Sequence, residues 1–334
     1  MGYDITRQSL GWTLFFFAAL ALLFWACSAL SPALAGVPEG TAMPLGRLLA
    51  RLSGSRPLLA EALAVLLALW NGLMIVRIIS RNMILLERTY MPVVVYLVVA
   101  CGSGFGAAML APLAASALMI GSFDRMMVSF RRVVTYSSLF NSSILAGLAL
   151  LVEPHTLVYA LSLPVALVVF KKGWRDWIVC WTGWLLPMAI ASYVYWGMGY
   201  RFDRLARLFA ESVAGGFSGG GFPAGWSDPA LLAFWGICVV VTGFSLVAFF
   251  RRAATMRTRA YRSFVYFLWI LFFSALLFVY PGRSAADFPL IAAPLAVIIP
   301  TYFNRRGGWL PDVIYLLLLG SAVAYNLLAL AGVR

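Results

Sequence analysis

Residues 231–250 read LLAFWGICVVVTGFSLVAFF, a run of twenty positions without a charged side chain. A helix needs roughly 20 apolar residues to cross the hydrocarbon core of a bilayer. Residues 12–30, WTLFFFAALALLFWACSAL, have the same character near the N-terminus. The strands of a membrane β-barrel would instead alternate apolar and polar residues. Both segments therefore predict membrane-spanning α-helices.

Similar apolar segments occur along the whole chain. Of its 334 residues, 63% are hydrophobic and 11% are charged, whereas soluble domains are about half apolar and a quarter charged. We therefore predict an all-α, polytopic transmembrane bundle that forms a single domain over residues 1–334. The predicted spans cover residues 10–30, 58–79, 90–103, 105–121, 139–153, 155–170, 174–197, 229–250, 264–281, 286–303 and 310–331.

Two segments, 90–121 and 139–170, hold about 32 residues each, which is long for one span and short for two. Each segment has residues that break helices at its centre. These are Gly102-Ser103-Gly104 in the first and Glu153-Pro154-His155 in the second. We interpret both segments as short helical hairpins.

The distribution of basic residues supports this interpretation. With both hairpins and a cytoplasmic N-terminus, 17 of the 25 Lys and Arg residues lie inside and 8 outside. Reducing both hairpins to single spans gives 14 inside and 11 outside, and reducing only the first gives 9 and 16. Because cytoplasmic loops carry the excess of Lys and Arg, we predict eleven spans, with the N-terminus inside, the C-terminus outside and both hairpin tips pointing outward.

The net charge of +13 has a membrane explanation rather than a nucleic-acid one. The basic residues form short clusters between apolar segments, where they orient the chain and contact anionic headgroups. The four cysteines lie in or beside apolar segments without metal-ligand spacing, and we interpret them as packing residues. We expect membrane lipids as partners, no nucleic acid, and a place in the bacterial inner membrane.

The first 35 residues resemble a secretory signal peptide, with Arg7 before an apolar run and Ala33-Leu34-Ala35-Gly36 after it. A signal sequence has an apolar core of about 7–15 residues, and residues 10–30 are longer. We therefore predict a retained first span.

Two outer loops are large. Residues 31–57 form the first, with Pro32, Pro38 and Pro44. In the second, residues 198–228, the first half has helical spacing of apolar residues and predicts an amphipathic helix on the membrane surface. Its second half, residues 215–225, is glycine-rich and predicts a mobile loop.

Several kinds of active site are excluded. No glycine run is followed by Lys-Ser or Lys-Thr, so a P-loop is absent. The chain has one histidine, which excludes zincin motifs and multi-histidine metal sites. Polar residues within the spans are few, which argues against an ion-coupled carrier.

Glu153-Pro154-His155 is the strongest candidate for a catalytic site. The predicted hairpin tip places a carboxylate beside the only imidazole of the chain. Such a pair suits proton transfer near neutral pH. The alternative is that these residues only end one helix and begin the next.

Other ionisable groups lie on the predicted outer side. Arg283 and Asp287 flank a late span, where an arginine can hold a phosphate or form an ordinary interfacial salt bridge. The row of arginines in the second outer loop can steer an anionic lipid or anchor its helix. The full outer set comprises Glu39, Glu61, Glu153, His155, Arg201, Asp203, Arg204, Arg207, Glu211, Asp228, Arg283 and Asp287.

The segments SILAGLALLVEPHTLVYALSLPVALVVFKKGWRDWIVCWTGWLLP and PGRSAADFPLIAAPLAVIIPTYF carry a resemblance. Together with the first span, outer loop and short hairpins, they resemble the GT-C superfamily of polyprenyl-phosphate-dependent glycosyltransferases. LFNSSILAGLALLVEP and FPLIAAPLAVIIPTYFNRR also resemble an uncharacterised family of polytopic integral membrane proteins from Bacteroidota. GT-C enzymes have an essential acidic residue, often a pair, in the first outer loop, whereas residues 31–57 contain only Glu39.

The resemblance implies transfer of a glycan linked to polyprenyl phosphate or another lipid, on the periplasmic side. It implies Glu39 or Glu61 as the base, with a divalent cation as one expectation at the acidic residue. Glu153 and His155 would assist proton transfer, and Asp203, Asp228 and Asp287 would support the site. The lipid phosphate would be held by Arg201, Arg204, Arg207 and Arg283. The alternatives are a non-catalytic membrane subunit that holds other envelope proteins, and, ranked last, a lipid or small-solute transporter.

Overall fold

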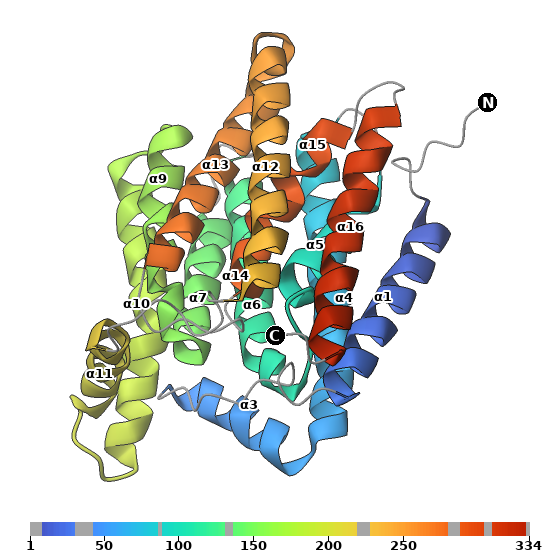
Figure 1. Ribbon diagram of the computed structural model, residues 1–334. Helices are drawn as coiled ribbons and strands as arrows, with labels where there is room; N and C mark the ends of the chain where they lie inside the picture. The colour runs from blue at the N-terminus through green and yellow to red at the C-terminus, as the bar shows by residue number, and fades with distance from the viewer. Residues whose placement is uncertain are drawn as a thin grey trace.

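The computed structural model describes residues 9–30, 43–85, 89–130, 136–218, 228–279, 288–303 and 309–331, and every regular element in these ranges is a helix (Figure 1). The predicted all-α class is confirmed for this part of the chain. The predictions for Glu39, Arg283 and Asp287 fall on residues outside the described ranges.

Within the described ranges, seven helices are long and apolar enough to cross a membrane. These helices fit a multi-pass integral membrane protein. They are α1 (Leu10–Leu30), α4 (Pro57–Asn82), α6 (Leu110–Ser129) with the short η1 (Ala107–Met109) before it, α10 (Trp174–Gly197), α12 (Pro229–Arg252), α13 (Thr258–Val279) and α16 (Trp309–Leu330).

Four shorter apolar helical segments fill the remaining predicted spans. The shortest, α5, has 11 residues and a length of about 16 Å at 1.5 Å per residue, about half the hydrocarbon core. The count of eleven spans and their orientation therefore remain predictions. The four segments are α5 (Met91–Cys101), α7 (Tyr136–Val152), η2 (Pro154–Thr156) continuing into α8 (Leu157–Ala160) and α9 (Ser162–Val169), and α14 (Phe288–Ile298) continuing into α15 (Pro300–Phe303).

Both predicted hairpin breaks are confirmed as helix ends. Helix α5 ends at Cys101, and the connection over residues 102–106 is entirely buried. Helix α7 ends at Val152 because Glu153 precedes a proline, which disfavours helical backbone; Glu153 is extended, with φ −134° and ψ 111°. Pro154 then opens η2, where its missing N–H costs nothing.

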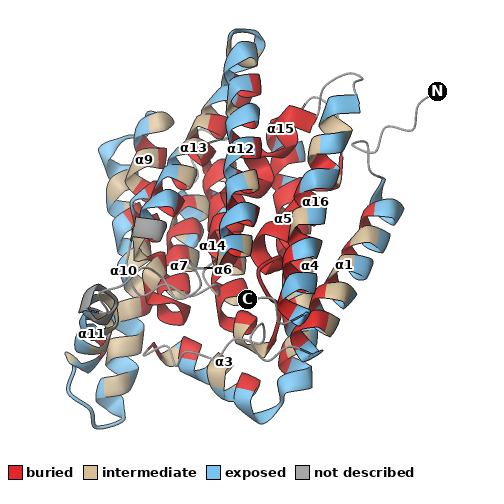
Figure 2. Ribbon diagram, viewed as in Figure 1, coloured by how far each residue is buried: buried red, intermediate tan, exposed pale blue. Residues whose placement is uncertain are grey.

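The centre of the bundle is formed by two of the shorter apolar helices, α5 and α14. Every residue of both is buried, and the two pack against each other (Figure 2). A helix that is apolar on all sides must be covered on all sides. The longer helices α4, α6 and α13 pack against this pair, and α1 and α12 add further contacts. Helices α1, α12 and α16 expose their outer faces, as a membrane-facing layer would. The four cysteines are buried, so their predicted packing role is confirmed.

Buried side chains also satisfy backbone groups of α14. Pro294 lies inside this helix and has no N–H to give to the carbonyl of Leu290. The Tyr159 hydroxyl donates to that carbonyl at 3.1 Å and lies 2.8 Å from Ser274 Oγ. Ser116 donates to the Pro289 carbonyl at 2.8 Å. Side chains from three other helices thus hold the irregular start of α14.

Replacing Tyr159 with phenylalanine should therefore lower the free energy of unfolding by about 1–2 kcal/mol, since it leaves the Leu290 carbonyl buried without its donor. The change is measurable as a lower SDS midpoint in detergent micelles. Restoring an N–H with Pro294→Ala should reduce the cost of Tyr159→Phe in the double variant. Equal costs in both backgrounds would contradict this role of the tyrosine.

The described parts of both large outer segments contain more helix than predicted. Residues 31–57 contain α3 (Pro44–Ser55), which was predicted as loop. The helix predicted in the second outer loop is confirmed as α11 (Arg204–Ser218). It extends over residues 215–218 of the segment predicted as a mobile glycine-rich loop, and the rest of that segment, 219–225, lies outside the described residues. Helices α3 and α11 lie at the same end of the bundle, opposite η3 (Ala253–Thr255), which joins α12 to α13 (Figure 1).

Candidate functional site

The turn between α7 and η2 brings a carboxylate and the only imidazole together. Glu153 Oε1 lies 2.7 Å from His155 Nδ1. The backbone holds this geometry, because the Glu153 carbonyl accepts from both the N–H and the hydroxyl of Thr156, at 3.1 and 2.8 Å. The predicted juxtaposition of Glu153 and His155 is confirmed by this distance.

The burial of the pair is uneven. The Glu153 side chain is 7% exposed and that of His155 is 21% exposed, yet His155 Nδ1 itself is inaccessible to solvent. The accessible part of the ring therefore lies away from Nδ1. A carboxylate this close to Nδ1 favours the tautomer that carries its proton on Nδ1.

Helix α11 packs beside this turn. Its Leu205 is fully buried and packs against Leu151 at the end of α7 and Met43 at the start of α3. Leu208 and Phe209 extend the same apolar face. The arrangement follows from the spacing of these residues, which places them on one side of the helix. The structure therefore brings α11 to the Glu153–His155 turn, with its arginines on the remaining faces.

The three arginines near the start of α11 are not equivalent. Arg207 lies 2.6 Å and Arg201 3.3 Å from the carboxylate of Asp203. Slight desolvation opposes ionisation of Asp203, but the Arg207 hydrogen bond and the charges of both arginines outweigh it and lower the pKa of Asp203. Asp203 thus stays ionised and compensates part of their charge. Arg204 has no carboxylate partner in the part of the chain that the structure describes, and its guanidinium lies 4.1 Å from the centre of the Tyr200 ring. Among the described residues that were predicted to bind the lipid phosphate, Arg204 is the best placed to receive an anion.

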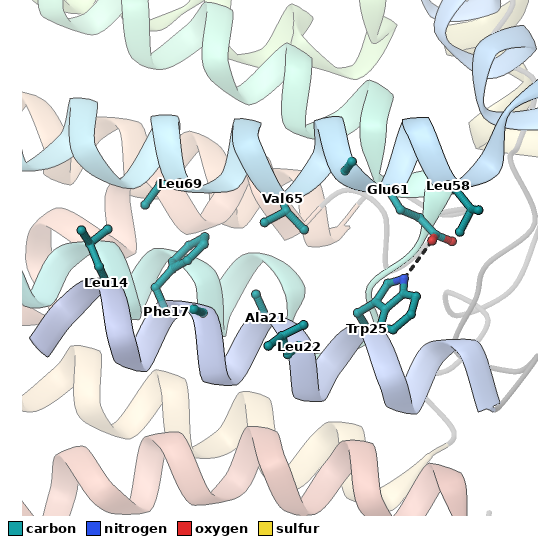
Figure 3. Close-up of a pocket in the computed structure, with 11 residues that line it drawn as sticks. Leu14, Phe17, Ala21, Leu22, Trp25, Leu58, Glu61, Val65 and Leu69 are labelled. Atoms are coloured by element: carbon teal, nitrogen blue, oxygen red, sulfur yellow. Dashed lines mark hydrogen bonds between the residues drawn. The ribbon is translucent and has the colours of Figure 1, made fainter. Parts of the chain in front are cut away.

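Glu61 lies in a separate groove between α1 and α4 (Figure 3). The groove has a volume of about 690 Å³, and Glu61 is the only carboxylate among the described residues that line it. Trp25 Nε1 donates to Glu61 Oε2 at 2.8 Å. Apolar side chains such as Leu14, Phe17 and Val65 line the rest. A chain of methylene or isoprene units fits this lining, and the carboxylate at one end would repel a phosphate but can accept from a hydroxyl.

Asp228 has a structural role. Its side chain accepts from the Ala230 N–H at 2.9 Å and caps the start of α12. Aspartate is among the preferred residues at this position because it satisfies a free backbone donor. Its predicted support of the Glu153–His155 site stays a prediction.

The described residues do not assemble a metal centre. No three His, Cys, Asp or Glu side chains in these ranges come close enough to hold an ion. No hydrogen bond or ion pair in the described part of the chain joins Glu61 to the Glu153–His155 pair. Glu61 lies in the groove between α1 and α4, whereas the pair lies in the turn between α7 and η2.

No protein-family model, no curated protein and no solved structure matches this chain.

Proposed function

We propose that the chain transfers a glycosyl group from a polyprenyl-phosphate or similar lipid-linked donor to a hydroxyl acceptor, at the membrane face that carries α3 and α11. The observation that carries this proposal is the 2.7 Å contact between Glu153 Oε1 and His155 Nδ1 beside a basic surface helix. A histidine oriented by a carboxylate is a common arrangement for a general base. The GT-C-like organisation of the sequence supplies the substrate class.

The proposed step is a displacement at the anomeric carbon of the sugar. The acceptor hydroxyl gives its proton to His155 Nε2 as its oxygen forms a bond to that carbon. The bond from the anomeric carbon to the phosphate oxygen breaks, and the lipid phosphate leaves with the bonding electrons. Glu153 is a positioning residue, since its carboxylate holds the proton on Nδ1 and stabilises the positive ring formed when Nε2 takes up the proton. Arg204 binds the departing phosphate.

The test is transfer of a radiolabelled sugar from a polyprenyl-phosphate donor by the purified chain in proteoliposomes. The proposal predicts product that accumulates with time and protein concentration, and none in protein-free vesicles. No transfer with any lipid-linked donor, from protein that is folded by size-exclusion and thermal criteria, would contradict it.

The same assay separates two assignments of the base. Glu39 and Glu61 are the residues that the GT-C resemblance implies for this role. Loss of transfer in Glu39→Gln/Glu61→Gln, with full transfer in His155→Gln, would move the base to those glutamates. The proposal predicts the reverse order of effects.

A second candidate function is that of a non-catalytic membrane subunit. The observation that favours it is α10, which exposes Trp174, Trp181 and Trp196. Only 17% of the residues in its most apolar stretch are buried within this chain. Tryptophan is enriched at protein interfaces. This candidate predicts a stoichiometric partner after purification in mild detergent and unchanged function in His155→Gln.

A further inference from the structure

A pocket of about 280 Å³ lies at the end of the bundle away from α3 and α11. Four helices meet around it: α4 and α6 at their last residues, α9 at its end, and α13 at its first turns. Its lining is half polar, unlike the apolar groove between α1 and α4. The lining residues are Asn82, Met127, Phe130, Phe170, Thr258, Arg259, Arg262 and Ser263.

The described side chains that line the pocket include two positive groups and no negative group. Arg259 and Arg262 line it, and neither guanidinium has a hydrogen bond or ion pair with another described residue. None of the described residues that line it carries a carboxylate. The acidic residue close by in the sequence of α6, Asp124, is buried and already lies 3.6 Å from Arg81. Two guanidinium groups that face one cavity repel each other, and an anion between them lowers this electrostatic energy.

A third basic group borders the pocket. Lys172 donates to the Ser129 carbonyl at 3.2 Å, and its ammonium lies 5.8 Å from the centre of the Phe130 ring. Phe130 and Phe170 stack with their ring centres 3.5 Å apart and form one wall. The described charged groups around the pocket are therefore cationic, apart from the paired Asp124.

The donors fit the oxygens of a phosphate group. An arginine guanidinium matches phosphate in a two-point geometry. Thr258 and Ser263 add hydroxyl groups, and Thr258 opens α13, whose first N–H groups have no partner within the helix. We infer that this pocket binds a phosphate group, with Arg259 and Arg262 as its principal ligands. It lies at the opposite end from the proposed transfer site, so the inference stands apart from the proposed function.

The phosphate can belong to a lipid headgroup or to a small solute, and two probes distinguish them. The purified chain is titrated with inorganic phosphate by calorimetry, and it is analysed by native mass spectrometry after incubation with vesicles of phosphatidylglycerol or of phosphatidylcholine. Retention of phosphatidylglycerol without heat from inorganic phosphate assigns a headgroup site. Binding of inorganic phosphate assigns a site for a small phosphate.

The variant Arg259→Gln/Arg262→Gln should weaken binding of the active probe at least about tenfold, because two charge-assisted contacts are lost. The matched control is Arg251→Gln/Arg257→Gln, which removes the same charge at the same end from residues that do not line the pocket. Equal losses in the two variants, or no loss in the first, would overturn the inference.

A second measurement needs no variant. In the wild-type chain, the bound probe should protect Arg259 and Arg262, but not Arg251, from an arginine-directed dicarbonyl reagent, read by peptide mass spectrometry. Unprotected Arg259 and Arg262 at saturating probe would overturn the inference even if the double variant failed to fold.

Discussion

Replacing His155 with glutamine is expected to lower the rate of glycosyl transfer by about 10²- to 10⁴-fold, the usual contribution of a positioned general base. Glutamine keeps the size and polarity of the side chain but cannot take up a proton near neutral pH. The loss should appear in kcat, with KM little changed, because the proton moves only in the transition state. Transfer of a labelled sugar in proteoliposomes measures both.

Glu153→Gln is the companion of this variant. It keeps a side chain of the same shape 2.7 Å from the ring but removes the charge that orients the imidazole. We expect a large loss of kcat here too, and a double variant no worse than His155→Gln alone, since the two residues act as one unit. Independent, multiplicative losses would show that Glu153 acts elsewhere.

The second large effect concerns the contact between α7 and α10. A Cβ on Gly147 would collide with the Trp184 carbonyl oxygen and lie 2.9 Å from Pro187 Cγ. On the facing helix, a Cβ on Gly183 of α10 would lie 3.0 Å from the carbonyl oxygen of Phe140 in α7. Small residues allow two helix backbones to approach in this way in a membrane. Gly147→Ala should therefore lower the free energy of unfolding by about 1–3 kcal/mol, read as the SDS midpoint in micelles.

The control is a Gly→Ala substitution at an exposed helical position, where it normally raises the free energy of unfolding. Alanine stabilises an exposed helical position by about 0.5–1 kcal/mol relative to glycine. Gly236 lies in α12 with open space where its Cβ would stand. Gly236→Ala should stabilise the chain as Gly147→Ala destabilises it. A neutral or stabilising Gly147→Ala would contradict the close approach of α7 and α10.

Much of the helical layout follows from the sequence, because apolar length and local breakers decide it. Pro154 ends α7 through the backbone of the residue before it, and this effect needs no distant contact. The helix α3 carried a signal too: Leu45, Leu48, Leu49 and Leu52 recur at helical spacing after Pro44. That spacing was missed because three prolines earlier in the segment indicated a loop.

The candidate site was predictable only where its residues are neighbours in sequence. Glu153 and His155 share one turn, so their contact followed from the breaker between two helices. The partner of Glu61 is Trp25, on another helix, and no local pattern predicts which faces of α1 and α4 meet. The burial of α5 and α14 at the centre likewise depends on how all the helices pack. The charge of Asp203 could be read from the sequence, but its preference for Arg201 and Arg207 over Arg204 required coordinates.

The most direct test of the account is the protonation of His155, the only histidine in the chain. Histidine labelled with ¹⁵N and ¹³C in a chain purified without a histidine tag gives one imidazole signal. At about pH 8, where an ordinary imidazole is neutral, we expect a proton on Nδ1 and none on Nε2. We also expect Glu153→Gln to remove this preference. A proton on Nε2 in the wild-type chain, unchanged by Glu153→Gln, would contradict the assignment of His155 as a base oriented by Glu153.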